Sequence, residues 1–257
     1  MYIDTHCHVI KSEYDNIEEV MDQLGKNVAI VCGDSEITNK EVIEVIERYS
    51  NLYGMIGIHP NEVDDMSSNA LNYIEENLKN NKIVGIGEIG LDYHYGKENS
   101  EKQKEIFIKQ LELARKYNVP VTIHSRDAAL DTFEIVKKYS DLKITYHCYS
   151  YSLEMAKELL KMNVKFGIGG VVTFKNSKSI KEVVKFLPIS NILLETDSPY
   201  LAPEPLRGTK NIPSNVKFVA QYISELKEIP LNIVLEETTK NAISQFDLNI
   251  YIVIQFF

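Results

Sequence analysis

Short apolar runs rich in β-branched residues alternate with amphipathic stretches along almost the whole chain. In the amphipathic stretches the apolar side chains recur at i, i+3 and i+4, the spacing of one helix face. Strand alternating with helix favours βαβ units and a parallel sheet. The eight runs that we expect to be strands are residues 3–9, 28–33, 52–59, 83–91, 119–124, 143–147, 164–172 and 192–196.

This strand–helix repeat has a nearly constant length. Successive marker residues near the predicted strand ends are 27, 26, 29, 36, 23, 25 and 25 residues apart. Eight units of this size that close on themselves form a (β/α)₈ TIM barrel, the α/β fold class that we predict. The alternative is an open doubly wound sheet. Its dinucleotide-binding form needs a glycine-rich first turn, which this chain lacks after its first predicted strand. The markers are His6, Gly33, His59, Glu88, His124, His147, Val172 and Asp197.

We expect a single domain, because neither a composition change nor a Gly/Ser-rich linker divides the 257 residues. One barrel core can hold a chain of about 250 residues. We place the barrel at residues 1–246, with helical stretches 213–227 and 231–246 after the last strand. Residues 247–257 form an unusually apolar tail, to which we assign no role.

The net charge of −9 argues against a broad basic face, so phosphate recognition is expected to be local. The three cysteines (Cys7, Cys32 and Cys148) lack CxxC spacing, which is typical of reduced thiols in a cytoplasmic protein. No secretory pattern begins the chain, and cleavage there would remove His6, so we expect this start to be the mature one. The apolar runs are too short to span a membrane, and we expect neither membrane contact nor an obligate protein partner.

The first predicted strand contains a His-X-His pair. Strand side chains alternate faces, so His6 and His8 would point the same way, about 7 Å apart. Cys7 would then point to the opposite face. Two neutral imidazoles on one face can bind a single divalent metal ion. A His-X-His pair could also occur by chance at a polar strand end. Other residues of the chain are therefore needed to distinguish a metal site from a chance pair.

Side chains that bind metals also end other predicted strands. Active sites of barrels lie at the C-terminal strand ends, so these residues would converge on one mouth. A lone histidine at a strand end is more often a packing residue, but six such accidents at one mouth are improbable. The six candidates are His6 and His8 on the first strand, Glu88 on the fourth, His124 on the fifth, His147 on the sixth and Asp197 on the eighth.

Mixed imidazole and carboxylate ligands, without a thiolate quartet, are typical of hydrolytic centres that leave a coordination position open for water. Six ligands exceed the needs of one such ion. Two ions bridged by Glu88 would share them, with His6, His8 and Asp197 on one ion and His124 and His147 on the other. We therefore expect one or two divalent cations (Mg, Mn or Zn), with Glu88 and Asp197 also catalytic. Bound water of lowered pKa would then make a serine or cysteine nucleophile unnecessary.

Taken together, these segments resemble the TatD-type metal-dependent deoxyribonucleases of the amidohydrolase superfamily. The resemblance runs in order from residue 1 to about residue 246. It implies a TIM barrel, one or two divalent ions and hydrolysis of DNA phosphodiesters, as a 3′→5′ exonuclease. It also implies metal binding by the same six residues. The matching segments are DTHCH (4–8), GIHP (57–60), GEIGLDY (87–93), IHSRD (123–127), HCYS (147–150), VTFKN (172–176), ETDSPYLAP (195–203) and RG (207–208).

The chain departs from this family pattern near the expected mouth. Tyr149 and Tyr151 replace the usual Phe and Gly after His-Cys, Ile212 replaces the Glu of Asn-Glu-Pro, and Asn61 replaces a His after Gly-Ile-His-Pro. None of these positions is a proposed ligand. The departures therefore bear on substrate preference rather than on metal binding.

Substrate contacts are expected from the loops after the last two strands, where barrels often bind phosphate. Arg207 is the best candidate, because its planar fork can pair bidentately with a phosphate. Lys175 would support it, and Tyr149 would stack on a base. The alternatives are a salt bridge for Arg207, a solvated surface for Lys175 and core packing for Tyr149.

Two other functions remain open at this point. The same barrel and ligand types serve amidohydrolases that act on a small cyclic amide, ester or phosphotriester, and fold alone cannot separate the two classes. Many of those enzymes use a carbamylated bridging lysine, whereas the bridging position here is Glu88, which favours the nuclease. A metal-binding protein without catalytic activity is the third interpretation.

Overall fold

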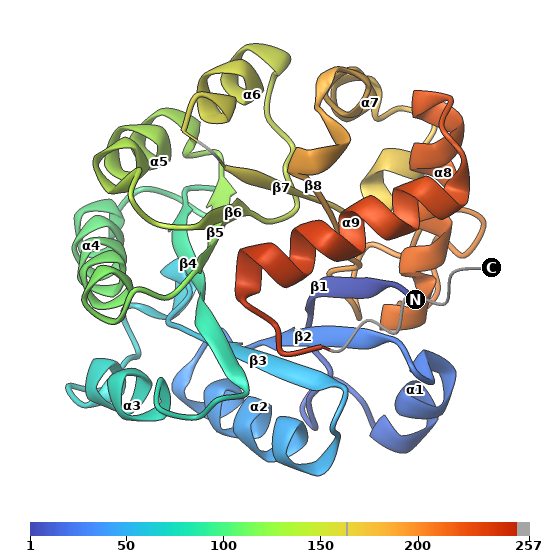
Figure 1. The fold of residues 1–257 in the computed structure, drawn as a ribbon. Helices are drawn as coiled ribbons and strands as arrows, with labels where there is room; N and C mark the ends of the chain where they lie inside the picture. Colours follow the sequence, from blue (N-terminus) through green and yellow to red (C-terminus); the bar gives the residue numbers. More distant parts are fainter. Residues whose placement is uncertain (163, 251–257) are drawn as a thin grey trace.

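The computed structural model describes residues 1–162 and 164–250. Eight parallel strands pair in sequence order around a central axis (Figure 1). They are buried on both faces, as is usual for strands covered by helices. The strands are β1 (Ile3–Cys7), β2 (Val28–Cys32), β3 (Leu52–Ile56), β4 (Ile83–Asp92), β5 (Val121–Arg126), β6 (Ile144–Tyr146), β7 (Lys165–Ile168) and β8 (Ile192–Leu194).

The barrel closes between the end of β1 and the residues that follow β8. Cys7 and Ser198 form an isolated parallel bridge. The His8 N–H donates to the Ser198 carbonyl at 2.7 Å, and the Asp197 N–H donates to the His6 carbonyl at 2.9 Å. The backbone that carries three predicted metal ligands therefore completes the barrel. The predicted TIM barrel is confirmed, and the open doubly wound sheet is excluded.

The helices form a ring outside the strands, and α9 lies across β1 and β8 (Figure 1). The helical stretch predicted at 213–227 begins with a 3₁₀ turn, Pro213–Asn215, before α8 starts. In the described part of the chain, the α-helices are α1 (Ile17–Leu24), α2 (Glu36–Arg48), α3 (Ala70–Asn77), α4 (Ser100–Tyr117), α5 (Ala129–Val136), α6 (Leu153–Leu160), α7 (Lys178–Phe186), α8 (Val216–Lys227) and α9 (Leu231–Phe246).

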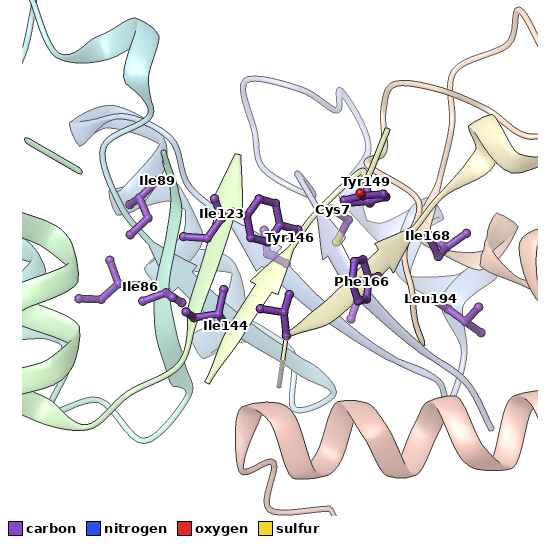
Figure 2. Packing of buried hydrophobic residues seen from close by; sticks show 14 of the residues in the cluster. Cys7, Ile86, Ile89, Ile123, Ile144, Tyr146, Tyr149, Phe166, Ile168 and Leu194 are labelled. Atoms are coloured by element: carbon purple, nitrogen blue, oxygen red, sulfur yellow. The ribbon is translucent and has the colours of Figure 1, made fainter. Parts of the chain in front are cut away.

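Two groups of buried side chains hold these layers together. The larger group includes Ile123, Phe166 and other apolar residues of the strands and helices (Figure 2). The smaller one joins Met55 to Phe246 of α9. Met55 Sδ also accepts a hydrogen bond from the Thr122 hydroxyl at 3.2 Å. Since β3 and β5 are not neighbours in the sheet, this contact crosses the barrel interior. The interior at this level is thus filled by side chains.

The start of α2 fixes the loop that follows β2. The Thr38 N–H donates to the Ser35 hydroxyl at 3.3 Å, and the Thr38 hydroxyl accepts from the Ser35 N–H at 2.9 Å. This reciprocal pair is a capping box, which satisfies two backbone donors at the helix start. In the same loop the Gly33 carbonyl accepts the Glu88 N–H at 2.9 Å. The loop therefore holds the backbone of a predicted ligand in place.

The seventh strand is shorter than predicted. It ends at Ile168, and Gly170–Thr173 forms a 3₁₀ helix, so Val172 does not end a strand. The reason lies in the packing of Gly170, where a Cβ atom would come within 2.1 Å of the Leu201 carbonyl oxygen. The Thr173 hydroxyl also donates to the Gly170 carbonyl at 2.7 Å, which supports the tight turn.

The predicted division into a barrel of residues 1–246 and a tail of residues 247–257 stays a prediction. Leu248 is buried in the same group as Phe246, so the first part of the tail packs on the barrel. Residues 251–257 lie outside the described part of the chain. Among the described residues, we find no helix with the length and apolar character needed to cross a membrane.

Candidate metal centre

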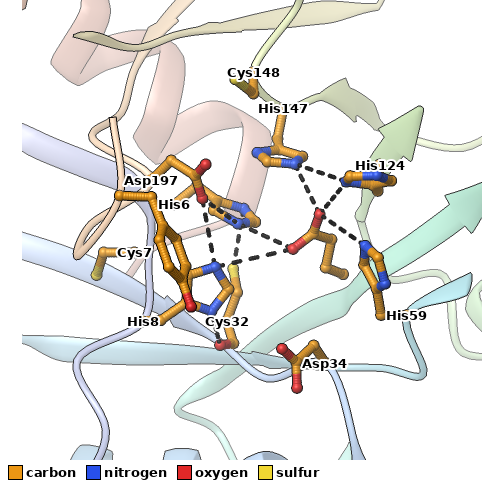
Figure 3. Close-up of polar contacts among 12 residues, drawn as sticks. His6, Cys7, His8, Cys32, Asp34, His59, His124, His147, Cys148 and Asp197 are labelled. Carbon is orange, nitrogen blue, oxygen red and sulfur yellow. Dashed lines mark hydrogen bonds and ion pairs between the residues drawn. The ribbon is translucent and has the colours of Figure 1, made fainter. Parts of the chain in front are cut away.

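All six predicted ligands lie close together at the mouth of the barrel, and Figure 3 labels the four histidines and Asp197. His6, Glu88 and His124 belong to β1, β4 and β5. The other three lie one to three residues beyond the ends of β1, β6 and β8, and they are His8, His147 and Asp197. The six residues that were predicted from their strand positions therefore lie in one site.

His6, His8 and Asp197 form the first group of donors. Asp197 Oδ1 lies 3.7 Å from Nε2 of His6 and 3.5 Å from Nε2 of His8. One donor atom from each of the three residues lies within 4.8 Å of the others. This is the group predicted for one of the two ions.

Glu88, His124 and His147 form the second group. Glu88 Oε1 lies 2.6 Å from Nδ1 of His124 and 2.8 Å from Nε2 of His147. Those two ring nitrogens are 3.4 Å apart. The other carboxylate oxygen of Glu88, Oε2, lies 3.3 Å from Nε2 of His6. The two oxygens of Glu88 therefore face different groups, which is the geometry that a bridging carboxylate requires.

The donor atoms fit a divalent cation. His6 Nε2 is buried and has no hydrogen-bond partner, although it faces two carboxylates. An unpaired buried nitrogen is costly, and a metal ion bound to its lone pair would satisfy it. Imidazole nitrogens together with carboxylate oxygens are also the ligand types that zinc and related ions use in open hydrolytic sites.

Mutual electrostatics shift the pKa of several of these groups. Burial alone would raise the pKa of Glu88, but the charge of His147 and the hydrogen bonds from His124 and His147 lower it well below its usual range. Burial lowers the pKa of His8, yet Asp197 outweighs this and raises it to about 9. In His147, burial is likewise outweighed by the carboxylates of Glu88 and Glu195, and its pKa rises well above normal. Without metal, protons on these histidines balance the carboxylates.

A second layer of groups orients three of the four histidines. Cys32 Sγ lies 3.3 Å from Nδ1 of His6, and the Cys32 carbonyl oxygen lies 2.9 Å from Nδ1 of His8. On the other side, Asp92 Oδ2 lies 3.1 Å from Nε2 of His124. Each ring is thereby left with its other nitrogen facing the centre, a common arrangement around metal-binding histidines. The contact of Cys32 with these rings was not predicted, although Cys32 and Ile30 are two residues apart on β2 and therefore share one strand face.

His59 adds a neutral histidine at the edge of the centre. Its Nδ1 accepts the Asn61 N–H at 3.1 Å, and its Nε2 lies 3.7 Å from Glu88 Oε1. Burial and the nearby His124 lower its pKa to about 4, so the ring is neutral at pH 7. Because Nδ1 is an acceptor, the proton sits on Nε2 and points toward Glu88.

The predicted substrate contacts differ in their surroundings. Arg207 and Lys175 are exposed, and the Arg207 guanidinium lies 4.4 Å from the centroid of the Phe174 ring. Tyr149, in contrast, is only 4% exposed, packs edge-on against Phe166 and donates its hydroxyl to the Ser152 carbonyl at 2.8 Å. Its ring has no face open to a base, so the structure supports core packing for Tyr149 and removes it from the set of expected contacts.

Comparison with known proteins agrees with this geometry. The family model described as "TatD related DNase" matches residues 3–247. The chain is 42% identical over 255 residues to the uncharacterized metal-dependent hydrolase YabD of Bacillus subtilis, covering 97% of this chain and 100% of that protein. It is 33% identical over 260 residues to the uncharacterized metal-dependent hydrolase YcfH of Escherichia coli K12, covering 96% of each.

A solved structure shows the same arrangement of the chain. The crystal structure of YJJV, a TatD homologue from Escherichia coli K12, superimposes with a TM-score of 0.89 at 27% identity. The superposition covers 96% of this chain and 98% of that one. The likeness therefore extends over the whole barrel rather than over one motif.

Proposed function

Because this chain belongs to the family of TatD-related DNases, we propose that it hydrolyses phosphodiester bonds of DNA, as a 3′→5′ exodeoxyribonuclease. The chain is a metal-dependent hydrolase. The observation that carries the proposal is the position of Glu88, whose two oxygens face different groups of histidines at the mouth. We further propose that the protein is cytoplasmic, which accords with its three free cysteines.

We propose that six residues hold one or two divalent cations. His6, His8 and Asp197 would bind one ion, and His124 and His147 the other, with Glu88 between them. When bound, such ions lower the pKa of water from about 15.7 toward about 7 and polarise the phosphoryl oxygen. Mg, Mn and Zn are the candidates, and the four imidazoles favour the transition metals among them.

The chain's own residues would orient the substrate and move protons. Burial raises the pKa of Asp197, but the hydrogen bond from His8, together with the charges of His147 and His6, outweighs this; the net shift is downward, so the carboxylate is ionised at neutral pH. With 15% of its side chain exposed, Asp197 can reach an attacking water and accept its proton. The neutral ring of His59, which is held by Asn61, directs its Nε2–H toward Glu88 Oε1 and would help to orient that carboxylate.

Arg207 would bind a phosphate next to the scissile one. Its guanidinium rests on the ring of Phe174, which restricts the side chain before the substrate arrives. Lys175 is the neighbouring exposed cation in the preceding loop. With a net charge of −9, the chain needs local cations of this kind to attract a polyanion.

Digestion of DNA labelled at one end tests the proposal. A 3′→5′ exonuclease releases label from the 3′ end first, only with divalent metal, and not after treatment with a chelator. Glu88→Ala purified in parallel controls for contaminating nucleases. If the parent protein leaves DNA intact but hydrolyses a small cyclic amide, ester or phosphotriester, the result would contradict the nuclease and support an amidohydrolase.

A further inference from the structure

Glu195 is a buried carboxylate with no role in the centre described above. It directly follows β8, is 0% exposed, and its Oε2 has no hydrogen-bond partner. Its Oε1 accepts the Cys148 N–H at 2.5 Å. Burying a carboxylate is expensive unless a charge or several hydrogen bonds compensate it. One backbone donor is a small compensation, so a second partner is expected nearby.

The nearest such partner is His147. Its Nδ1 lies 3.7 Å from Glu195 Oε1 and is itself buried without a hydrogen-bond partner. Its Nε2 points the other way, 2.8 Å from Glu88 Oε1. The imidazole of His147 therefore lies between two carboxylates, one inside the metal centre and one behind it. Metal-binding histidines commonly donate the N–H of their second ring nitrogen to a carboxylate in this position.

Two glycines of β7 and the turn after it, Gly167 and Gly169, lie against Glu195. A Cβ atom on Gly167 would meet Glu195 Oε2 at 2.0 Å, and a Cβ on Gly169 would be in ordinary contact with the side chain at 3.6 Å. Any larger residue at position 167 would displace the carboxylate. The absence of a side chain at Gly167 is thus explained by the space that Glu195 occupies beside His147.

We propose that Glu195 is a positioning residue for His147, and this inference rests on the proposed metal centre. Its carboxylate holds the proton on Nδ1, so that the lone pair of Nε2 faces the ion shared with Glu88 and His124. The effect is specific to that ion, because the histidines of the other group, His6 and His8, are oriented by Cys32 instead.

The test is metal binding by the Glu195→Gln variant, which keeps the size of the side chain and removes its charge. The protein is stripped with a chelator and titrated with Zn²⁺ against a competing chelator of known affinity. Loss of such an outer partner typically weakens metal binding by about 10- to 100-fold. We expect a loss of this size for one ion and no change for the other. Anomalous diffraction should place the weakened ion at Glu88, His124 and His147.

Two further variants separate positioning from a general structural effect. Glu195→Asp keeps the charge but shortens the side chain, so it should recover part of the affinity lost in Glu195→Gln. Cys32→Ala removes the thiol behind His6, and it should weaken the other ion instead. If Glu195→Gln does not fold, the same selective loss, smaller in size, is expected from Glu195→Asp.

Three results would overturn the inference. In the first, both ions bind Glu195→Gln as tightly as the parent. In the second, both ions are weakened equally and the metal-free protein melts at a lower temperature, which would make Glu195 merely structural. In the third, the parent binds no metal, which would overturn the proposed centre as well. A parent protein that binds two ions but does not cleave DNA would contradict only the proposed nuclease activity. The positioning role of Glu195 would stand.

Discussion

Glu88 Oε2 lies 3.3 Å from Nε2 of His6, whereas the other carboxylate oxygen, Oε1, faces His124 and His147. One residue of β4 thus connects a donor of β1 with a donor of β5 and a donor that follows β6. This connection makes the two groups of donors one centre, and it ties the two proposed ions to a single side chain.

Replacement of Glu88 by alanine should therefore affect both ions. We expect Glu88→Ala to lower metal content at both positions and to abolish hydrolysis, because each ion loses an oxygen ligand. Elemental analysis after dialysis measures the metal, and Glu105→Ala on the exposed face of α4 is the matched control. Unchanged metal content with retained activity would contradict the bridging arrangement.

Metal binding at pH 7 should release protons. In the metal-free protein the pKa of His8 is raised to about 9 by Asp197, and that of His147 is raised well above normal by Glu88, so both rings are protonated at pH 7. A metal ion needs the neutral rings and displaces these protons. Apparent affinity should fall as the pH falls below about 9, by about tenfold per pH unit for each proton displaced.

Calorimetric titrations in two buffers with different heats of ionisation measure this release. The observed heats should differ between the buffers, and His8→Gln should release fewer protons than the parent. His94→Gln, which changes an exposed histidine paired with Asp127, should release as many as the parent. Identical heats in both buffers would mean that the histidines are already neutral before metal binds.

Cys7 lies between two metal ligands in the sequence but faces away from them (Figure 3). It is 0% exposed, and its thiol donates to the Ile30 carbonyl at 3.4 Å within the larger apolar group. Cys7→Ser places a hydroxyl among apolar side chains. We expect the free energy of unfolding to fall by about 1–3 kcal/mol, with metal stoichiometry unchanged. Urea unfolding and elemental analysis measure the two quantities, and sulfur ligation in a zinc X-ray absorption spectrum would contradict the prediction.

Much of this architecture could be predicted from the sequence, because the barrel repeats one local unit. The spacing of the apolar runs indicated the strands, and strand position alone brought His124 and Asp197 to the same mouth. Alternation of side chains also placed His6 and His8 on one face and Cys7 on the other. These conclusions depend on local periodicity, which a sequence displays directly.

Contacts between distant segments could not be predicted in the same way. The 3₁₀ turn after β7 depends on the carbonyl of Leu201 lying against Gly170, which no local pattern reveals. Tyr149 was expected at the mouth, but its packing on Phe166 is decided by how β6 and β7 pair. Glu195 lies two residues before Asp197, so alternation could have placed it on the same face, yet its partner His147 comes from another strand.

Substitution of Arg207 distinguishes a DNA substrate from a small-molecule substrate. If Arg207 binds a backbone phosphate, Arg207→Ala should weaken DNA processing about equally across sequences and reduce its salt dependence, because phosphates carry no sequence information. Hydrolysis of a small phosphodiester that cannot reach this loop should change much less. Rates on both substrates at two salt concentrations measure these effects.

The matched control for Arg207→Ala is Arg48→Ala. Arg48 is an exposed arginine at the last residue of α2, so both variants change the net charge from −9 to −10. A helix that follows a barrel strand runs back to the opposite end of the barrel, so the control removes a charge far from the mouth. If the two variants lose DNA processing equally, the effect belongs to overall charge rather than to a phosphate contact. If Arg207→Ala slows both substrates alike, Arg207 instead supports the metal centre or the fold of its loop.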